Sequence, residues 1–248
     1  MPGRNAMVPA FQALVSPAKD RPPLFLELRD LLTPADVARL TALGSELRFV
    51  DGRLSNPHNV TKANLQADMT DSRYGESVKI VMDAFARSRA FQDFAMPTKI
   101  APPLLARYEP GMKYGAHADV AFMNVTIDGA VTRLRSDISC TVFLSDPASY
   151  AGGELVLHVG TRPVMIKGAP GEAFVYPSTL LHEVRPVTHG QRLVSITFIE
   201  SLVPDERERN ALFELKDVLS LEGLKMDWVS RVRMEVALHN LTRLWSRS

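Results

Sequence analysis

The most informative stretch of the chain runs from residue 108 to residue 119 and reads Tyr108-Glu109-Pro110-Gly111-Met112-Lys113-Tyr114-Gly115-Ala116-His117-Ala118-Asp119. Side chains alternate between the two faces of an extended strand, so His117 and Asp119 project from the same face and can bind one cation together. The pair alone is weak support, because six histidines and 28 acidic residues would supply about half a match by chance. A third ligand has to come from elsewhere in the chain.

The sequence around this stretch is typical of β structure. Short runs rich in β-branched and aromatic residues are separated by Gly, Pro, Asp and Asn. The predicted strands cover residues 104–108, 139–144, 154–159, 162–166, 172–176, 182–187 and 192–200. Many short strands at this spacing predict a sandwich or barrel.

Two residues, one in each of the last two predicted strands, complete the candidate site. His182 opens a strand after Tyr176-Pro177, and Arg192 follows ten residues later. Arginine can bind the carboxylate of a dicarboxylate ligand through two parallel hydrogen bonds. If residues 188–190 form a three-residue hairpin loop, His182 lies opposite Ile196 and shares a face with Arg192.

Helices are predicted on both sides of the β region. Thr33 before Pro34 marks a helix start, residues 75–88 carry an apolar stripe, and apolar spacing returns after Pro204 in helices expected to brace the barrel. Residues 1–23, with prolines at 2, 9, 17, 22 and 23, are expected to form a loosely ordered N-terminal arm. We therefore expect one domain over residues 24–248, with helical and mixed support at 24–100, a β core at 101–203 and C-terminal helices at 204–248.

The long segment 121–135, with Asp128-Gly129 as a turn, is interpreted as a loop that either covers the site as a lid or is an ordinary connection. His58, His158 and His189 are interpreted as surface or turn residues. Tyr114 and Met112 are interpreted mainly as packing residues, although they could flank a metal pocket.

Charge and composition exclude several classes of protein. The formal net charge is +1, so no global field would attract nucleic acid or an anionic membrane. The single cysteine, Cys140, cannot form an internal disulfide and is expected to be buried. No stretch resembles a secretory signal or a membrane span, so the expected location is the cytoplasm.

A larger set of residues carries a family resemblance. They are Tyr108, Gly111, Tyr114, His117, Asp119, Asp137-Ile138-Ser139, Phe143-Leu144-Ser145-Asp146-Pro147, Gly152-Gly153-Glu154-Leu155, Tyr176-Pro177-Ser178, His182, Val187-Thr188, Gly190 and Arg192, with Phe49-Val50-Asp51-Gly52-Arg53, Lys62-Ala63-Asn64, His239-Asn240-Leu241, Arg243 and Trp245 outside that region. Together they resemble the PKHD-type hydroxylases, relatives of the prolyl 4-hydroxylase catalytic domain, over roughly residues 24–246.

The resemblance implies a mainly β fold with flanking helices around a double-stranded β-helix, or jelly-roll, core. It also implies an Fe(II)- and 2-oxoglutarate-dependent dioxygenase. In such an enzyme His117, Asp119 and His182 bind iron, Arg192 binds 2-oxoglutarate and Tyr108 contacts the same co-substrate. The chain departs from the family at Val120-Ala121-Phe122 and at His158, which leaves the metal site alone but changes the substrate pocket.

The expected reaction uses O2 and 2-oxoglutarate, releases succinate and CO2, and hydroxylates a C–H bond, with ascorbate as the reductant that keeps iron ferrous. Two alternatives stay open: a non-catalytic metal-binding or sensing barrel, and a cupin-like metalloenzyme that does not use 2-oxoglutarate. The substrate is either a small molecule or a peptidyl residue; candidates are a prolyl residue, a free amino acid and a small molecule of iron uptake. The terminal helices could support a homodimer.

Overall fold

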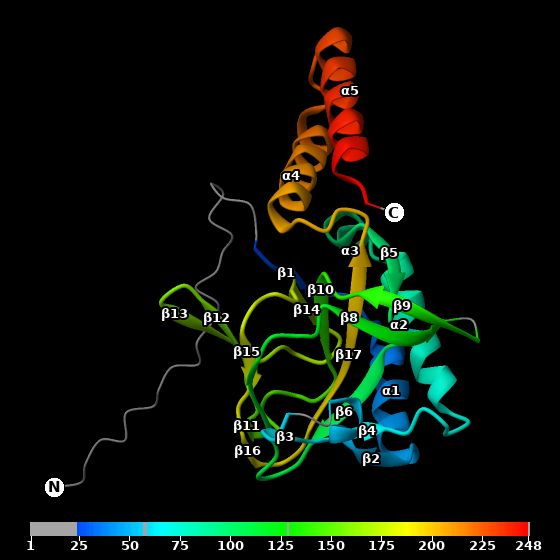
Figure 1. Ribbon diagram of the computed structural model, residues 1–248, viewed down its shortest axis with the longest axis vertical. Helices are drawn as coiled ribbons and strands as arrows, with labels where there is room; N and C mark the ends of the chain where they lie inside the picture. The colour runs from blue at the N-terminus through cyan, green and yellow to red at the C-terminus, as the bar shows by residue number, and fades with distance from the viewer. Residues whose placement is uncertain (1–23, 57–58, 128, 248) are drawn as a thin grey trace, which may run out of the picture.

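The computed structural model describes residues 24–56, 59–127 and 129–247, and its centre is a pair of facing antiparallel sheets (Figure 1). The larger sheet has the order β1 (Leu26–Leu28), β14 (Ala173–Pro177), β10 (Ile138–Phe143), β17 (Arg192–Ser201), β6 (Leu104–Tyr108), β4 (Leu65–Ala67) and β2 (Phe49–Asp51), with β5 (Pro97–Ile100) also paired to β17. The smaller sheet has the order β13 (Arg162–Ile166), β12 (Leu155–Val159), β15 (His182–Val184), β7 (Lys113–His117) and β3 (Lys62–Ala63). The predicted jelly-roll core is confirmed.

Alternation along the strands of the larger sheet creates two apolar layers. In β10, Ile138, Cys140 and Val142 join the cluster on the helix side of the sheet, while Phe143 joins the cluster between the sheets. Cys140 is buried as expected, and its burial raises the pKa of the thiol well above the ordinary value. The inner cluster lines the space into which the candidate site residues project.

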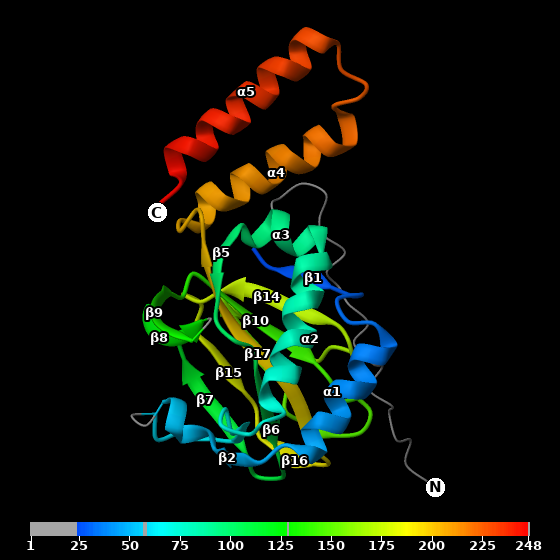
Figure 2. The same cartoon turned by 90° about the vertical axis from the view of Figure 1, so that its right-hand side faces the viewer.

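Three helices cover the outer face of the larger sheet, as the turned view in Figure 2 shows. They are α1 (Pro34–Glu46), α2 (Tyr74–Arg87) and α3 (Arg89–Ala95), and a short 3-10 helix, η1 (Gly52–Ser55), follows β2. α1 begins where the sequence predicts, because Thr33 and Asp36 form a capping box ahead of Pro34. α3 was not predicted; it has only seven residues and begins where the Ser88 side chain caps it.

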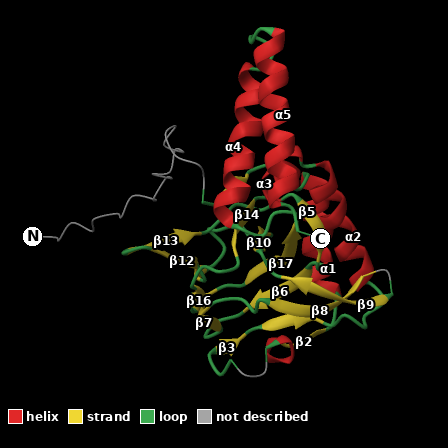
Figure 3. Ribbon diagram, turned by 45° about the horizontal axis from the view of Figure 1, so that its top comes forward, coloured by secondary structure: helices red, strands yellow, loops and turns green. Residues whose placement is uncertain are grey.

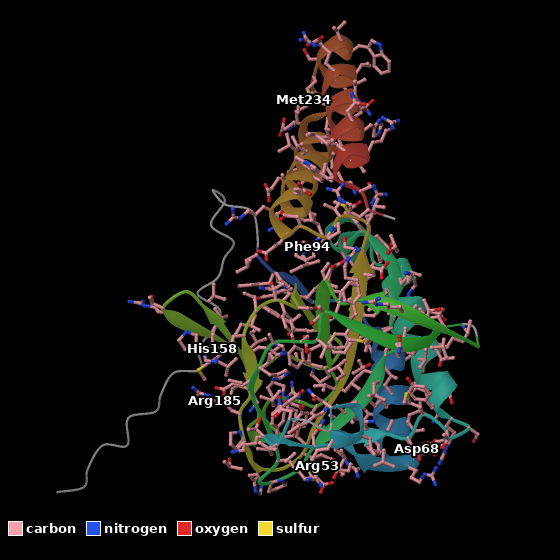
Figure 4. The ribbon with its side chains drawn as sticks, viewed as in Figure 1. Arg53, Asp68, Phe94, His158, Arg185 and Met234 are labelled. Carbon is pink, nitrogen blue, oxygen red and sulfur yellow. The ribbon has the colours of Figure 1, made fainter. Side chains whose placement is uncertain are left out.

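The C-terminal helices α4 (Glu206–Glu222) and α5 (Trp228–Trp245) form a hairpin that projects from the sheets (Figures 1 and 3). Figure 4 shows Met234 far out on this hairpin, whereas Phe94 lies at its base. The expectation that these helices brace the barrel is wrong for most of their length, because only the base packs on the domain, through Leu212 and Leu238.

The predicted homodimer stays a prediction. No helix in the described part of the chain is long and apolar enough to span a bilayer.

Two further connections differ from the predictions. Residues 188–190 do not join two paired strands: β16 (Val187–His189) pairs with β11 (Ala151–Gly152), whereas β17 pairs with β10 and β6, and Ile196 lies opposite Thr141 and Leu104. The hairpin prediction is therefore wrong, although Gly190 has the expected positive φ of 72°. The segment 121–135 is not a loop but a β-ribbon of β8 (Phe122–Ile127) and β9 (Ala130–Arg135). The predicted arm at 1–23 lies outside the described residues.

Candidate active site

The structure brings His117, Asp119 and His182 together at one end of the smaller sheet. His117 ends β7 and His182 begins β15, and the two residues are direct partners across that ladder. Nε2 of His117 lies 3.8 Å from Oδ1 of Asp119, and Nε2 of His182 lies 3.7 Å from Oδ2. All three donor atoms lie within 4.8 Å of one another. This spacing suits ligands that share one ion about 2 Å away from each.

The backbone fixes the orientation of both imidazoles. Nδ1 of His117 donates to the carbonyl oxygen of Gly115 at 2.8 Å, and Nδ1 of His182 donates to that of Leu180 at 2.9 Å. These bonds select the tautomer with the proton on Nδ1, and in a neutral ring of that tautomer Nε2 is free to bind a metal. Burial lowers the pKa of His117, and the neighbouring His182 lowers it further, so this ring is neutral near pH 7.

A chain of three hydroxyl groups supports the Asp119 carboxylate. Ser139 donates to Oδ2 of Asp119 at 2.6 Å, Ser178 lies 2.6 Å from Ser139, and Ser136 donates to Ser178 at 3.0 Å. Because each hydroxyl has one hydrogen, Ser178 must donate to Ser139. The three serines are buried, so the chain restrains the carboxylate without solvent.

Aromatic rings enclose the two histidines. The ring of Tyr114 stacks on His117 with centroids 3.7 Å apart and planes 19° apart, and Tyr176 meets His182 edge-on at 5.2 Å. Burial raises the pKa of Tyr176 well above its ordinary value, so it is a neutral phenol. Tyr114 thus does flank the triad, which was the less favoured interpretation of its sequence position.

Arg192 opens β17 and lies opposite Tyr108 of β6. Its side chain is 2% exposed, and its guanidinium lies 5.1 Å from the ring of Tyr108 and 6.0 Å from that of Phe143. Among the described residues no carboxylate forms an ion pair with Arg192, and its Nε has no hydrogen-bond partner. A buried, uncompensated cation is costly, so this arrangement fits a site for an anionic ligand.

The donor set fits a specific pair of ligands. Two histidines and one carboxylate on one side of an ion are the ligands of non-haem Fe(II) oxygenases, and they leave positions open for other molecules. Arg192 supplies a fixed cation for a carboxylate, and burial raises the pKa of Tyr108 to about 12, which keeps its hydroxyl a hydrogen-bond donor. The residues present therefore fit Fe(II) together with a dicarboxylate.

Comparisons with known proteins agree with this chemistry. The model of the 2OG-Fe(II) oxygenase superfamily matches residues 103–200. A PKHD-type hydroxylase of Sphingopyxis alaskensis is 47% identical over 221 residues, which cover 89% of this chain and 99% of that protein. The chain belongs to the PKHD-type hydroxylases. A second member, from Xanthomonas campestris, is 35% identical over 228 residues, which are 90% of this hydroxylase and 99% of the relative.

One solved structure shows the same fold as this hydroxylase. It is a Trichoplax adhaerens prolyl hydroxylase in complex with a peptide fragment of the hypoxia-inducible factor oxygen degradation domain. The TM-score is 0.54 at 17% identity, over 76% of this chain and 86% of that one. At this identity the likeness concerns the fold alone.

The hydroxylase also contains site residues that the sequence did not single out. Ser139 and Ser178 were noted only within family motifs and Ser136 not at all, and none was predicted to support Asp119. Ser139 alternates with the helix-side residues of β10 and so had to face inward. Lys62 was noted only as part of a family motif, yet it is buried beside Tyr114. His158, labelled in Figure 4, is exposed on β12, as expected. His58 lies outside the described residues.

Proposed function

We propose that the protein hydroxylates a C–H bond of its substrate with Fe(II), 2-oxoglutarate and O2, and that His117, Asp119 and His182 are the iron ligands. In this proposal Arg192 binds the distal carboxylate of 2-oxoglutarate and Tyr108 donates a hydrogen bond to the co-substrate. One observation carries the proposal: two histidine Nε2 atoms flank a carboxylate, and a buried arginine nearby has no ion-pair partner in the described chain.

In this proposal the residues of the chain bind and orient the metal ion and the co-substrate, and they exclude water from the site. The Gly115 and Leu180 carbonyls hold the imidazole rings in the ligating form, and Ser139 holds the carboxylate. Arg192 is among the largest fully buried side chains, so its interaction with a carboxylate is little weakened by solvent. When bound, Fe(II) supplies the redox chemistry by which O2 oxidises 2-oxoglutarate to succinate and CO2 and hydroxylates the substrate.

The proposal also concerns the reductant and the cellular compartment that repeated turnover requires. Fe(II) has to stay reduced, so ascorbate should sustain activity over many turnovers, and a reducing cytoplasm is the favoured compartment. The single free and buried Cys140 is consistent with such a compartment. The primary substrate is a small molecule or a peptidyl residue.

Anaerobic titration tests the proposal directly. Fe(II) and then 2-oxoglutarate are added to the purified apo-protein while the visible metal-to-ligand charge-transfer band is recorded. We expect a band in the wild type, no band in His182→Ala, and a band that requires far more 2-oxoglutarate in Arg192→Ala. Arg185→Ala, an exposed arginine, is the matched control and should behave as the wild type does. Iron binding without a band at any 2-oxoglutarate concentration would refute the proposal and favour a metal-binding barrel.

A further inference from the structure

A second buried cation lies beside the candidate site. Lys62, in β3, pairs with Tyr114 of β7 in the smaller sheet and is 6% exposed. Its Nζ donates to Oγ of Ser55 at 2.6 Å, and Ser55 in turn donates to the carbonyl oxygen of Gly52. An ammonium group has three hydrogens, so this one side-chain partner leaves two hydrogens for other acceptors.

Lys62 is connected to the metal ligands through Tyr114. Its Nζ lies 5.0 Å from the centroid of the Tyr114 ring, and that ring stacks on His117. The Tyr114 oxygen accepts a hydrogen bond of 2.9 Å from Nδ2 of Asn56, so its own hydrogen is free to donate elsewhere. The ammonium and the phenol hydroxyl thus provide two donors next to the triad.

The charge of Lys62 is poorly balanced in the protein itself. Among the described residues no carboxylate lies within 4.0 Å of its Nζ; the carboxylates that favour its charged form from farther away are Asp119 and Asp51, and Asp51 is already paired with Arg53. Burial lowers the pKa of Lys62 to about 8, which still leaves the side chain mainly protonated at neutral pH. A methionine could fill the same space without this cost, so packing alone does not explain a lysine here.

The proposed ligands would not remove this imbalance. Asp119 would serve the metal ion, and the metal ion and Arg192 together would balance the two carboxylates of 2-oxoglutarate. Lys62 would then remain a buried cation without a counter-ion, and one further anionic group would complete the balance of charge.

We propose that Lys62 and the hydroxyl of Tyr114 bind a carboxylate of the primary substrate, so that the enzyme acts on a molecule or peptide end that carries a free acid close to the hydroxylated carbon. This inference rests on the proposed function and narrows its substrate class. Such a subsite should bind an acid in preference to the corresponding amide, because a buried ammonium group and a hydroxyl placed for an anion bind a neutral isostere poorly.

NMR titration with acetate tests this subsite without the unknown substrate. The labelled protein is loaded with diamagnetic Zn(II) and saturated with 2-oxoglutarate, which occupies the Arg192 site, and acetate or acetamide is then added at constant ionic strength. We expect saturable shifts of the backbone amides of Ser55, Lys62 and Tyr114 with acetate and none with acetamide. In Lys62→Met the apparent Kd for acetate should rise at least about tenfold.

Lys113→Met is the matched control, because it removes an exposed lysine from β7 beside the same ladder. It should leave the acetate Kd unchanged. Equal responses to acetate and acetamide in the wild type, unchanged acetate binding in Lys62→Met, or acetate binding that disappears once 2-oxoglutarate is present would each overturn the inference. The preceding 2-oxoglutarate titration reports on the proposed function alone, so failure there is distinguished from failure of the Lys62 subsite.

Discussion

Ser139 of the larger sheet donates a 2.6 Å hydrogen bond to Oδ2 of Asp119, whose two partner histidines lie on the smaller sheet. The bond connects β10 to the segment that follows β7 at the candidate metal site, and it restrains the carboxylate that faces both Nε2 atoms. A supporting residue of this kind acts on the metal through the ligand that it orients.

Replacing Ser139 by alanine should weaken metal binding about ten- to a hundredfold. The fold should persist, because the substitution removes one buried hydroxyl and leaves the β10 ladder intact. Competition with a chromophoric chelator for Zn(II) gives the affinity. Ser136→Ala is the control, since its hydroxyl reaches Ser178 and not Asp119, and it should have the smaller effect. Equal affinities for wild type and Ser139→Ala would show that the carboxylate does not need this bond.

Tyr108→Phe should raise the Kd for 2-oxoglutarate about tenfold while metal affinity stays the same. Burial keeps the Tyr108 phenol protonated up to a pKa of about 12, so its hydroxyl donates at all ordinary pH values. The measurement is the concentration of 2-oxoglutarate that half-develops the charge-transfer band. Tyr74→Phe, in α2 on the outer face of the larger sheet, should have no effect. A Tyr108→Phe enzyme with wild-type 2-oxoglutarate affinity would exclude Tyr108 from the co-substrate site.

Much of the fold follows from local patterns. Strands β6 and β13 occupy the predicted residues, because turn-forming residues such as Pro and Gly bound each run of β-branched and apolar residues. α1 begins at Pro34 because Thr33 and Asp36 satisfy the first backbone N–H groups. These signals lie within a few residues of each other, so the sequence alone reveals them.

Pairing partners were harder to predict, because they depend on distant segments. Gly190 has the left-handed conformation expected of a hairpin loop, yet the strands on either side of it join different ladders. A turn conformation fixes the local chain direction but not the strand that it approaches. The same limit explains α4 and α5, whose apolar spacing predicted helices but not that they would project from the sheets.

The residues of the candidate site likewise fall into those that a local sequence motif identifies and those that only the folded structure reveals. His117 and Asp119 lie two residues apart, and Arg192 follows His182 by ten, so a motif could identify all four. Ser139 and Lys62 come from β10 and β3, and their importance depends on which side chains the two sheets bring next to them. No spacing in the sequence contains that information.

Gly152→Ala should destabilise the fold far more than Gly160→Ala. Both glycines have positive φ, 72° and 59°, so each substitution strains the backbone by about 1 kcal/mol. A Cβ at Gly152 would also lie 2.0 Å from the carbonyl oxygen of Pro186, whereas one at Gly160 meets nothing within 4 Å. We expect a loss of about 3 kcal/mol or more at Gly152 in urea unfolding. Similar midpoints for the two variants would mean that the β11 and β16 ladder adjusts freely.

Lys62→Met should be more stable than the wild type at neutral pH, with a difference that disappears as pH rises. The pKa of Lys62 is about 8 in the folded protein, against an ordinary value of 10.5. Below pH 8 both states are protonated and the folded state bears the full cost of the buried charge, about 3 kcal/mol at most. Between pH 8 and 10.5 the unfolded state binds more protons than the folded state, so the stability of the wild type rises toward that of the variant.

Urea unfolding of both proteins at pH 7, 8.5 and 10 measures this difference, and Lys113→Met, which removes an exposed charge, should show no comparable trend. Groups other than Lys62 titrate alike in wild type and variant, so their contributions cancel in the comparison. A difference that stays constant over this range would mean that Lys62 titrates normally and that its burial costs little. A shrinking difference would show that the protein retains a destabilising cation next to Tyr114, as a carboxylate-binding subsite requires.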